Sequence, residues 1–307
     1  MSILVLGSLN MDLVGRVERL PQPGETLLGE TFEMVPGGKG ANQAVAAARL
    51  GSPVQMIGRV GSDAFGQTLL DSLQRDRVVI EGVTLDSETA SGVALIAIAA
   101  TGENQIIVLP GANRCVGEPE LQRLSGQLPQ AQVLLLQFEV PQPVVEQAAA
   151  LAHQAGVQVI VDPAPARQPA SPNFFQQIDI LTPNQVEATQ LCGFEVCDRR
   201  SAAKAAKHLR QLGAATVIVK LGHQGAVVES ADARFEQPAF PVAAVDTVAA
   251  GDAFNGGLAA ALVEGQTLPQ AVRFASAVAA LCVSQPGAQS AMPDRAALDA
   301  FLTAPTR

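Results

Sequence analysis

The stretch PQPVVEQAAALAHQAGVQVIV, residues 141–161, decides the class of fold. Its first part, Pro141–Ala155, favours a helix, and Gly156 is typical of a helix C-terminus. The run Val157–Val161 follows this glycine at once and is typical of a buried strand. A helix that leads directly into such a strand indicates an α/β fold with a parallel sheet.

The same order of elements recurs further along the chain. Arg199–Leu212 favours a second helix, which ends at Gly213 and is followed by the apolar run Thr216–Leu221. Because the alternation continues over nearly the whole sequence, we expect a three-layer α/β sandwich with a mostly parallel central sheet. Further strands are predicted at Ile3–Leu6, Val54–Val60, Val133–Phe138 and Ile178–Leu181, and further helices at Asn42–Leu50, Asp63–Gln74, Asp252–Glu264, Leu268–Val283 and Asp294–Leu302.

Two segments break this alternation. Residues 13–36 contain prolines and a glycine between short extended pieces, and residues 90–110 are rich in Val, Ile and Thr around a turn at 101–104. Both patterns are typical of antiparallel excursions outside the main sheet, and they predict a small antiparallel β-flap, or lid. Since no repeat or long linker divides the rest, residues 1–307 are expected to form a single domain that carries this lid.

The composition excludes several classes of protein. Hydrophobic residues make up 48% of the 307 residues and charged residues 16%, against about 25% charged residues in typical soluble proteins. A chain this rich in apolar residues is not disordered as a whole. The formal net charge of −9 argues against partners such as nucleic acid or an anionic membrane, whereas a phosphorylated ligand needs only a local positive site.

The location predicted from the sequence is cytoplasmic. The longest uninterrupted apolar run, Val93–Ala100, is far shorter than the ~20 residues that span a bilayer. The N-terminus lacks a basic leader and a small-residue cleavage site, so it is expected to form the first strand and not a signal peptide. The four cysteines show neither a disulfide framework nor zinc spacing, and reduced thiols are expected.

A first polar motif, residues 7–12 (GSLNMD), lies at the end of the first predicted strand. Ligands of open parallel sheets bind beyond the carboxyl ends of the strands. Asn10 and Asp12 point to the same side if the backbone is extended, and an amide beside a carboxylate suits hydroxyl groups. An Asx-type turn without a ligand is the alternative.

A second motif, residues 37–43 (GGKGANQ), resembles a phosphate loop but does not have its spacing. The pattern G-x4-G-K-[ST] requires Gly at position 33 and Ser or Thr at position 40, where this chain has Glu33 and Gly40. Its glycines would bring backbone amides, Lys39 and Asn42 close to a bound ligand. A turn at the start of a helix, with a solvated lysine, is the alternative.

The third motif, residues 246–257 (DTVAAGDAFNGG), carries the strongest signal. Small residues lead directly into an Ala-rich helix, whose free amides and dipole favour an anion. Asp252 lies where that anion would bind, and a carboxylate there repels a phosphate. The combination makes sense if Asp252 takes a proton from a hydroxyl while the amides stabilise a transferring phosphoryl group. An Asp252 that only caps the helix is the alternative.

A fourth motif, residues 182–187 (TPNQVE), follows the predicted strand Ile178–Leu181. Asn184 and Glu187 are three residues apart and share one face of a helix. Such a pair suits a hydrated Mg²⁺ close to phosphates, although the signal is weak by itself.

Together these four motifs, in this order and over essentially the whole chain, resemble the ribokinase-type family of ATP-dependent carbohydrate kinases. They are more similar to its ribose-specific members than to its fructokinases, adenosine kinases or phosphofructokinases, many of which have Gly in place of Ala249. The resemblance implies transfer of the γ-phosphoryl group of ATP to the 5-hydroxyl of D-ribose, giving D-ribose 5-phosphate. A related kinase for 2-deoxyribose, fructose or adenosine is the alternative within the family.

The resemblance also implies roles for individual residues. Asp252 would be the general base, and the amides of Ala249, Ala250 and Gly251 would form the anion hole. Ribose would be bound by Asn10, Met11, Asp12, Gly38, Lys39, Gly40, Asn42, Glu139 and Asp252. ATP would be bound by Asn184, Lys220, Leu221, Gly222, His223, Gln224, Gly225, Gly251, Asp252 and Ser276.

Two cations are implied by the same resemblance. Mg²⁺ would accompany ATP and be organised indirectly by Glu187, although Gln185 stands where the family often has Glu. A monovalent cation, usually K⁺, would lie beside the anion hole, at Asp246, Val248, Cys282, Gln285, Gly287 and Ala291. Most of these residues would contribute backbone carbonyls. Ala291 departs from the members that have Ser there, because it has no hydroxyl oxygen.

The implied macromolecular partner is a second copy of the chain, since the lids of two subunits commonly pair into a homodimer and close over the sugar, excluding water. A non-catalytic sugar-binding protein is the alternative from another class, but it would not need Asp252, the anion hole or Asn184. A serine hydrolase and a nicotinamide dehydrogenase lack support, because G-x-S-x-G and G-x-G-x-x-G are both missing.

Overall fold

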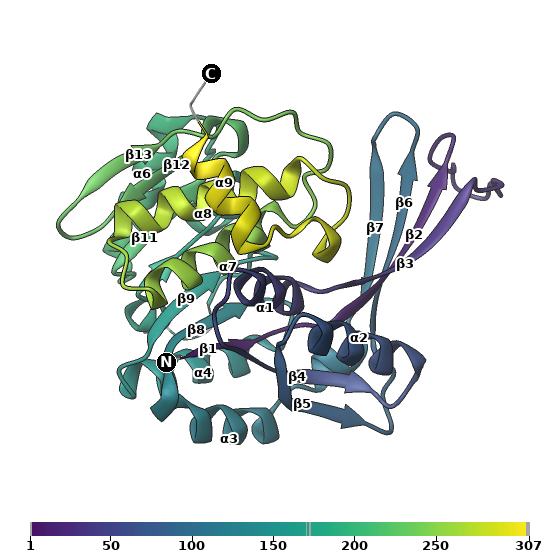
Figure 1. Ribbon diagram of the computed structural model, residues 1–307, viewed down its shortest axis with the longest axis horizontal. Coiled ribbons are helices and arrows are strands. Elements are labelled where there is room, and N and C mark those ends of the chain that lie inside the picture. Colours follow the sequence, from purple (N-terminus) through teal and green to yellow (C-terminus); the bar gives the residue numbers. More distant parts are fainter. Residues whose placement is uncertain (1, 170, 172, 305–307) are drawn as a thin grey trace.

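The computed structural model describes residues 2–304 except 170 and 172. Nine strands of this part form the main sheet, in the order β13-β12-β11-β10-β9-β8-β1-β4-β5 (Figure 1). Neighbours from β11 to β5 run parallel, and β12 and β13 form an antiparallel edge. The strands are β1 (Ser2–Leu6), β4 (Val54–Gly61), β5 (Val79–Asp86), β8 (Ala131–Gln137), β9 (Gln158–Asp162), β10 (Ile180–Leu181), β11 (Thr216–Lys220), β12 (Ala226–Glu229) and β13 (Arg234–Gln237).

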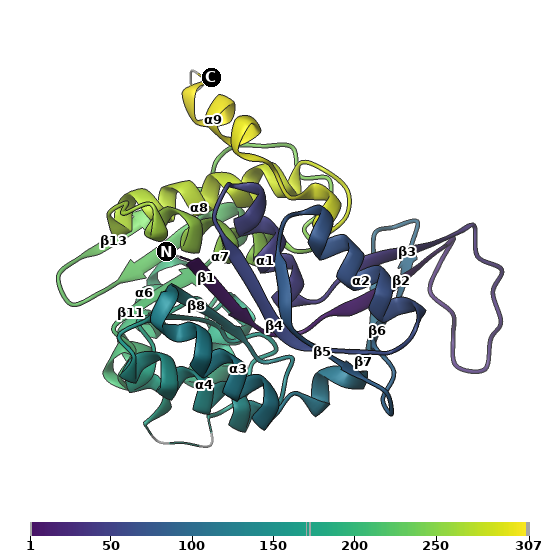
Figure 2. The same ribbon diagram turned by 60° about the horizontal axis from the view of Figure 1, so that its bottom comes forward.

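Helices cover both faces of this sheet (Figure 2). One layer contains α1 (Lys39–Arg49), α2 (Ala64–Arg75), α7 (Ala250–Val263), α8 (Leu268–Val283) and α9 (Arg295–Thr303), and the other contains α3 (Glu118–Gln127), α4 (Gln142–Gln154), α5 (Gln185–Cys192) and α6 (Arg199–Gln211). Alternate side chains of β1 feed the two cores: Ile3 and Val5 join the first, whereas Leu4 and Leu6 join the second. No helix in the described part of the chain has the length and hydropathy needed to cross a bilayer.

The predicted three-layer α/β sandwich is confirmed, but three kinds of element escaped the sequence pattern. Strand β5 lies at the sheet edge and buries only one of its eight residues, Gly82, so it contains no buried apolar run. Helix α3 buries only three residues, and its apolar stripe is correspondingly weak. The edge strands β12 and β13 are short. Helix α1 begins at Lys39, three residues before the predicted start, because Gly38 ends the preceding strand with φ 91°.

The lid is a separate sheet of four strands among the described residues, β3-β2-β6-β7, which projects from the body (Figure 1). It consists of β2 (Asn10–Val17), β3 (Thr31–Gly37), β6 (Gly92–Ala99) and β7 (Asn104–Leu109). The outer pairs are antiparallel, as predicted, but the central pair β2–β6 runs parallel. Both central strands leave the body at its carboxyl edge, after β1 and β5, and therefore point outward in the same direction.

The order of the main sheet places a topological switch point beside β1. Strand β1 lies between β4, which follows it through the first layer of helices, and β8, which comes much later in the chain. Ligands of open α/β sheets bind outside the carboxyl ends of strands at such a point. The polar residues that follow β1, β8, β9 and β10 therefore surround one place, and the start of α7 packs on α1 above it.

Candidate active site

Asp252 lies in the first turn of α7 and is buried. Its Oδ2 accepts a hydrogen bond from Asn42 Nδ2 at 3.0 Å, and its Oδ1 accepts one from Gln43 Nε2 at 3.1 Å. Burial raises the pKa of this carboxyl, and the positive charge of Lys39 opposes that rise. Asp252 is therefore a stronger base than an exposed aspartate, although its carboxylate already has two donors.

The start of α7 leaves backbone amides free. Its N-cap residue, Ala249, adopts the left-handed conformation (φ 61°), which costs about 1 kcal/mol for a residue with a Cβ. The helix has no side-chain cap, so Asp252 does not act as its N-cap. The Ala250 amide donates weakly to the Thr247 carbonyl at 3.3 Å, and the amides of Gly251 and Asp252 have no acceptor in the described part of the chain.

A buried network connects Asp252 with a second carboxylate. Gln43 Nε2 donates to Asp162 Oδ2 at 3.1 Å as well as to Asp252, and Lys220 Nζ contacts Asp162 Oδ1 at 2.9 Å. Gln137 Nε2 holds the Oε1 of Gln43 at 2.7 Å. Roles for Gln43, Gln137 and Asp162 were not predicted from the sequence. The available signal for Asp162 was its place at the end of a strand, and Gln43 directly follows Asn42.

On the sugar side of the predicted site, Glu139 follows β8 and accepts hydrogen bonds from Ser8 Oγ at 2.5 Å and from the Lys39 amide at 3.2 Å. Gly38 allows the chain to pass against the end of β1, because a Cβ there would lie 2.7 Å from the Asn10 amide. Gly40 is constrained in the same way, with a Cβ 2.7 Å from the Ser8 amide. Met11 lies in the apolar core, so its side chain does not join this group.

Asp12 lies on β2 with Asn10, as expected for two residues that share one side of a strand. Burial raises its pKa to about 7, and the negative charges of Glu139 and Asp252 add to that rise. Three carboxylates thus face one region, which is an arrangement typical of a site that receives hydroxyl donors.

We expect Asp12→Asn to stabilise the ligand-free protein in a pH-dependent way. Because the pKa is raised from 3.8 to about 7 on folding, the ionised carboxylate destabilises the folded state above pH 7, and this destabilisation fades as the pH falls towards the unfolded value. Thermal unfolding should show a Tm a few degrees higher for the variant at pH 8, and a smaller difference at pH 5. A Tm difference that grows on acidification would contradict this assignment.

Lys39 is the cation that the surrounding carboxylates share. Burial lowers its pKa, but the negative charges of Asp252, Asp162, Glu139 and Glu187 outweigh that effect, so the net shift is upward. The ammonium group forms no direct ion pair with any carboxylate of the described residues. It therefore remains available to a ligand that enters between them.

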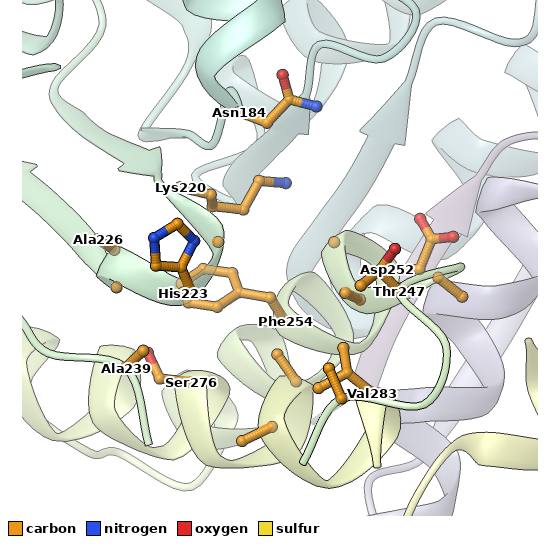
Figure 3. Close-up of a pocket in the computed structure, with 18 of the residues that line it drawn as sticks. Asn184, Lys220, His223, Ala226, Ala239, Thr247, Asp252, Phe254, Ser276 and Val283 are labelled. Carbon is orange, nitrogen blue, oxygen red and sulfur yellow. The ribbon is translucent and has the colours of Figure 1, made fainter. Parts of the chain in front are cut away.

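A cavity of about 870 Å³ extends from Asp252 along the start of α7. Figure 3 shows Asp252 and Thr247 at one end, Ala239 and Ser276 at the other, and Lys220 pointing into the space between Asn184 and α7. Among the residues predicted to bind ATP, Leu221 is buried in the core and Gln224 does not reach the cavity. The others line it: Asn184, Lys220, Gly222, His223, Gly225, Gly251, Asp252 and Ser276. Lining residues that sequence reasoning missed include Ala239, Phe240, Thr247, Phe254, Ala279 and Val283.

The Asn184–Glu187 pair forms a capping box at the start of α5. Glu187 accepts from the Asn184 amide at 2.7 Å and from Asn184 Nδ2 at 2.8 Å, while the Glu187 amide donates to Asn184 Oδ1 at 2.9 Å. Each carboxylate oxygen keeps a second lone pair, and Glu187 lines the cavity. No group of three or more Asp, Glu, His or Cys residues in the described ranges could hold a metal by itself. The residues therefore fit a hydrated Mg²⁺ that is bound chiefly by phosphates and water.

The residues predicted to surround a monovalent cation lie in two segments, the loop before α7 and the stretch from the end of α8 through the loop that follows it to η5 (Gln289–Ala291). Asp246 joins these loops, because its Oδ1 accepts from the Val248 amide at 2.9 Å and its Oδ2 from the Gly287 amide at 3.0 Å. The Asp246 amide itself donates to the Val283 carbonyl at 3.2 Å. Cys282 and Ala291 are buried, and the Gln285 amide donates to the Cys282 carbonyl. The backbone carbonyls of these loops that accept no hydrogen bond, together with the carboxylate of Asp246, remain as oxygen donors for a cation. Oxygen donors of this kind suit K⁺.

Comparison with known proteins defines the class of this protein as a carbohydrate kinase. Residues 1–295 match the model of the pfkB family of carbohydrate kinases. The ribokinase of Haemophilus influenzae is 42% identical over 294 residues, which cover 96% of each chain. The deoxyribokinase of Salmonella typhi is 35% identical over 303 residues, which cover 99% of each.

The solved structures agree with the sequence relatives. The structure of Arabidopsis thaliana ribokinase complexed with ribose and ATP is 33% identical, covers 99% of both chains and superposes with a TM-score of 0.91. The chain described here belongs to the pfkB family of carbohydrate kinases.

Proposed function

We propose that this protein transfers the γ-phosphoryl group of ATP to the 5-hydroxyl of D-ribose and releases D-ribose 5-phosphate and ADP. The observation that carries the proposal is the place of Asp252. This buried carboxylate of raised pKa lies at the uncapped start of α7, where a cavity large enough for a nucleotide meets a cluster of hydroxyl-binding side chains. The similarity to ribokinases supports ribose as the acceptor.

In the proposed reaction, Asp252 accepts the proton of the 5-hydroxyl as that oxygen attacks the γ-phosphorus. The bond between the γ-phosphorus and the β–γ bridging oxygen breaks, and the electron pair leaves with ADP. The free amides at the start of α7 stabilise the negative charge on the transferring group. The raised pKa of Asp252 favours proton acceptance, while the positive charge of Lys39 lowers that pKa and so favours the ionised form that acts as the base. Asp252 afterwards releases the proton to solvent.

Asn10, Asp12, Asn42 and Glu139 are proposed to hold the sugar hydroxyls, with the backbone of 38–40 close beside them. Asn42 supports this role, because its Oδ1 is buried without a partner in the described part of the protein. A buried acceptor of this kind is costly unless a ligand hydroxyl donates to it.

Cations complete the proposed site. Mg²⁺ bound to the ATP phosphates supplies charge neutralisation, and Glu187 and Asn184 are proposed to hold its water shell. A monovalent cation is proposed between the loops that Asp246 joins, where it would hold the start of α7 in shape.

We therefore expect K⁺ to activate the enzyme. At saturating MgATP and sugar, kcat should rise several-fold when K⁺ replaces tetramethylammonium at constant ionic strength, because the large organic cation does not fit between the loops. Asp246→Asn should weaken this activation. Identical rates in K⁺, Na⁺ and tetramethylammonium would contradict the proposed cation site.

The lid is proposed to close over the sugar and to pair with the lid of a second copy. It exposes apolar side chains on both of its faces: neighbours Ile106 and Ile107 on β7 are 51% and 60% exposed, and Phe32 on β3 is 63% exposed. Sedimentation of the purified protein tests the pairing, since a monomer at micromolar concentration would rule it out.

The remaining proposals are that residues 1–307 fold as one domain with this lid, and that the protein works in the cytoplasm, a location supported by four free cysteines.

The substrate is tested by measuring ADP release with Mg²⁺ and K⁺ present and D-ribose, 2-deoxyribose, fructose, adenosine or no sugar. D-ribose should give the highest kcat/KM. The similarity to a deoxyribokinase makes 2-deoxyribose the informative comparison. A preference for 2-deoxyribose would replace the sugar and keep the mechanism, whereas tight sugar binding without ADP release would favour a binding protein.

A further inference from the structure

Asn113 lies outside the cavity, in the 3₁₀ turn η1 (Gly111–Cys115) that follows the lid strand β7. It is 1% exposed. Its side chain bonds to the backbone of Leu9 on both sides, accepting from the Leu9 amide at 2.9 Å and donating to the Leu9 carbonyl at 2.9 Å. Its second N–H donates to Asn10 Oδ1 at 2.7 Å. One side-chain amide thus holds both backbone polar groups of Leu9 and the side chain of the next residue, Asn10.

The four chain crossings between body and lid lie close together, and three of them contact the Asn113 amide or contain it. Leu9 and Asn10 form the first crossing, from β1 to β2, and Gly38 forms the second, against the Asn10 amide. Gly92, which begins β6, forms the third crossing. It lies against the Asn10 and Asn113 side chains, since an added Cβ would collide with Asn10 Oδ1 and Asn113 Nδ2. The fourth crossing runs from β7 into η1 and contains Asn113 itself. The Asn113 side chain therefore lies at the junction of lid and body, the point about which a closing lid would pivot.

The bond from Asn113 also determines which atom Asn10 presents. Because Asn10 Oδ1 accepts from Asn113 Nδ2, the Nδ2 of Asn10 is the atom left to face outward, and it has no partner among the described residues. Asn10 therefore offers two hydrogen-bond donors in a region that holds the acceptors Asp12, Glu139 and Asp252 and the donor Lys39. A sugar hydroxyl can then donate to a carboxylate and accept from Asn10.

We propose that Asn113 is a positioning residue that fixes the amide of Asn10 as a hydrogen-bond donor to the sugar and ties this orientation to the pivot of the lid. The proposal rests on the proposed function in so far as Asn10 binds the acceptor sugar. It predicts that Asn113 controls sugar affinity without touching the sugar, and that nucleotide affinity is independent of it.

The test is Asn113→Asp, which keeps the shape and the acceptor for the Leu9 amide but removes both donated bonds. The new carboxylate oxygen faces Asn10, which should turn its Nδ2 towards it and present Oδ1 to the sugar. The KM for sugar should then rise by between about 10- and 100-fold, as for a lost and reversed hydrogen bond in a buried site. The KM for ATP should stay within about twofold. Asn173→Asp, the same change at an exposed residue of the body outside the lid, is the matched control and should leave both values unchanged.

Asn10→Asp provides a second variant if Asn113→Asp does not fold. It leaves every bond made by Asn113 in place and replaces the outward donor by an acceptor, so it should reproduce the rise in sugar KM. An unchanged sugar KM in a folded Asn113→Asp or in Asn10→Asp would overturn the proposal. Equal rises in the KM for sugar and ATP would also overturn it, because they would indicate a merely structural role.

Deuterium exchange, which needs no substrate, tests the pivot separately. In Asn113→Asp, amides of residues 9–17 and 92–99 should exchange at least tenfold faster than in the wild type, while those of α6 keep their rates. Unchanged exchange in both segments would overturn the role at the pivot. Wild-type protein that turns over none of the sugars would instead refute the proposed function, and the exchange result would still decide the pivot.

Discussion

Asp252→Asn is expected to lower kcat by between about 10²- and 10⁴-fold, the usual contribution of a general base. The variant keeps the size of the side chain but cannot accept the hydroxyl proton. Asn42 can turn its amide to accept from the new NH₂ group, since its Oδ1 has no partner among the residues that the structure describes. The protein should therefore fold, and calorimetric titration should show that it still binds the sugar, although more weakly than the wild type because Asn42 Oδ1 no longer accepts from a sugar hydroxyl.

Two comparisons make this result interpretable. Asp232→Asn, the same change at an exposed loop residue, should leave kcat unaltered. A kcat for Asp252→Asn within tenfold of the wild type would remove Asp252 from the chemical step. The rate enhancement would then come from the anion hole and from holding the two substrates together.

Lys39→Met is expected to change both the rate and its dependence on pH. Lys39 lowers the pKa of Asp252 against the larger, opposite effect of burial. Without this cation the pKa of Asp252 rises further, so a smaller fraction of the base is ionised at pH 7. The limb of the pH–kcat profile on which the rate rises with pH should therefore move to higher pH. At pH 7 we expect kcat to fall about 10²-fold, with partial recovery at higher pH.

The control for this variant is Lys207→Met, which removes an exposed lysine of α6 and should leave the profile unchanged. Profiles should be measured at saturating sugar and MgATP, because Lys39 is also proposed to contact the sugar. If kcat falls by the same factor at every pH and the rising limb of the profile stays at the same pH, Lys39 acts only in binding. The role assigned to its charge would then be wrong.

The sequence predicted the architecture well because burial imposes simple patterns on it. Parallel strands buried on both faces contain continuous apolar runs, such as Val133–Leu136, and glycine separates two of the strands from the preceding helix. The edge elements β5 and α3 were missed for the opposite reason, since they bury few side chains. The parallel pair β2–β6 could not be predicted from local pattern, because it joins segments far apart in the chain.

The candidate site divides in the same way. Asp252, Lys39 and Asn42 were predictable because each lies in a short motif of glycines and small residues. Gln43, Asp162 and Asn113 were not, because their importance lies in partners distant in the chain: Gln43 contacts Asp162 119 positions away, and Asn113 contacts Asn10 103 positions away. A buried amide that bridges two segments shows no periodicity, and only the folded chain reveals its role.

The most direct test of the central claim is the position of the phosphate in the product made from D-ribose and MgATP. Proton-coupled phosphorus NMR distinguishes a phosphate on the C5 oxygen, which couples to two protons, from one on the C1 oxygen, which couples to one. We expect D-ribose 5-phosphate and one ADP for each sugar consumed. Phosphate on another oxygen, or inorganic phosphate released without a sugar phosphate, would contradict transfer to a hydroxyl activated by Asp252.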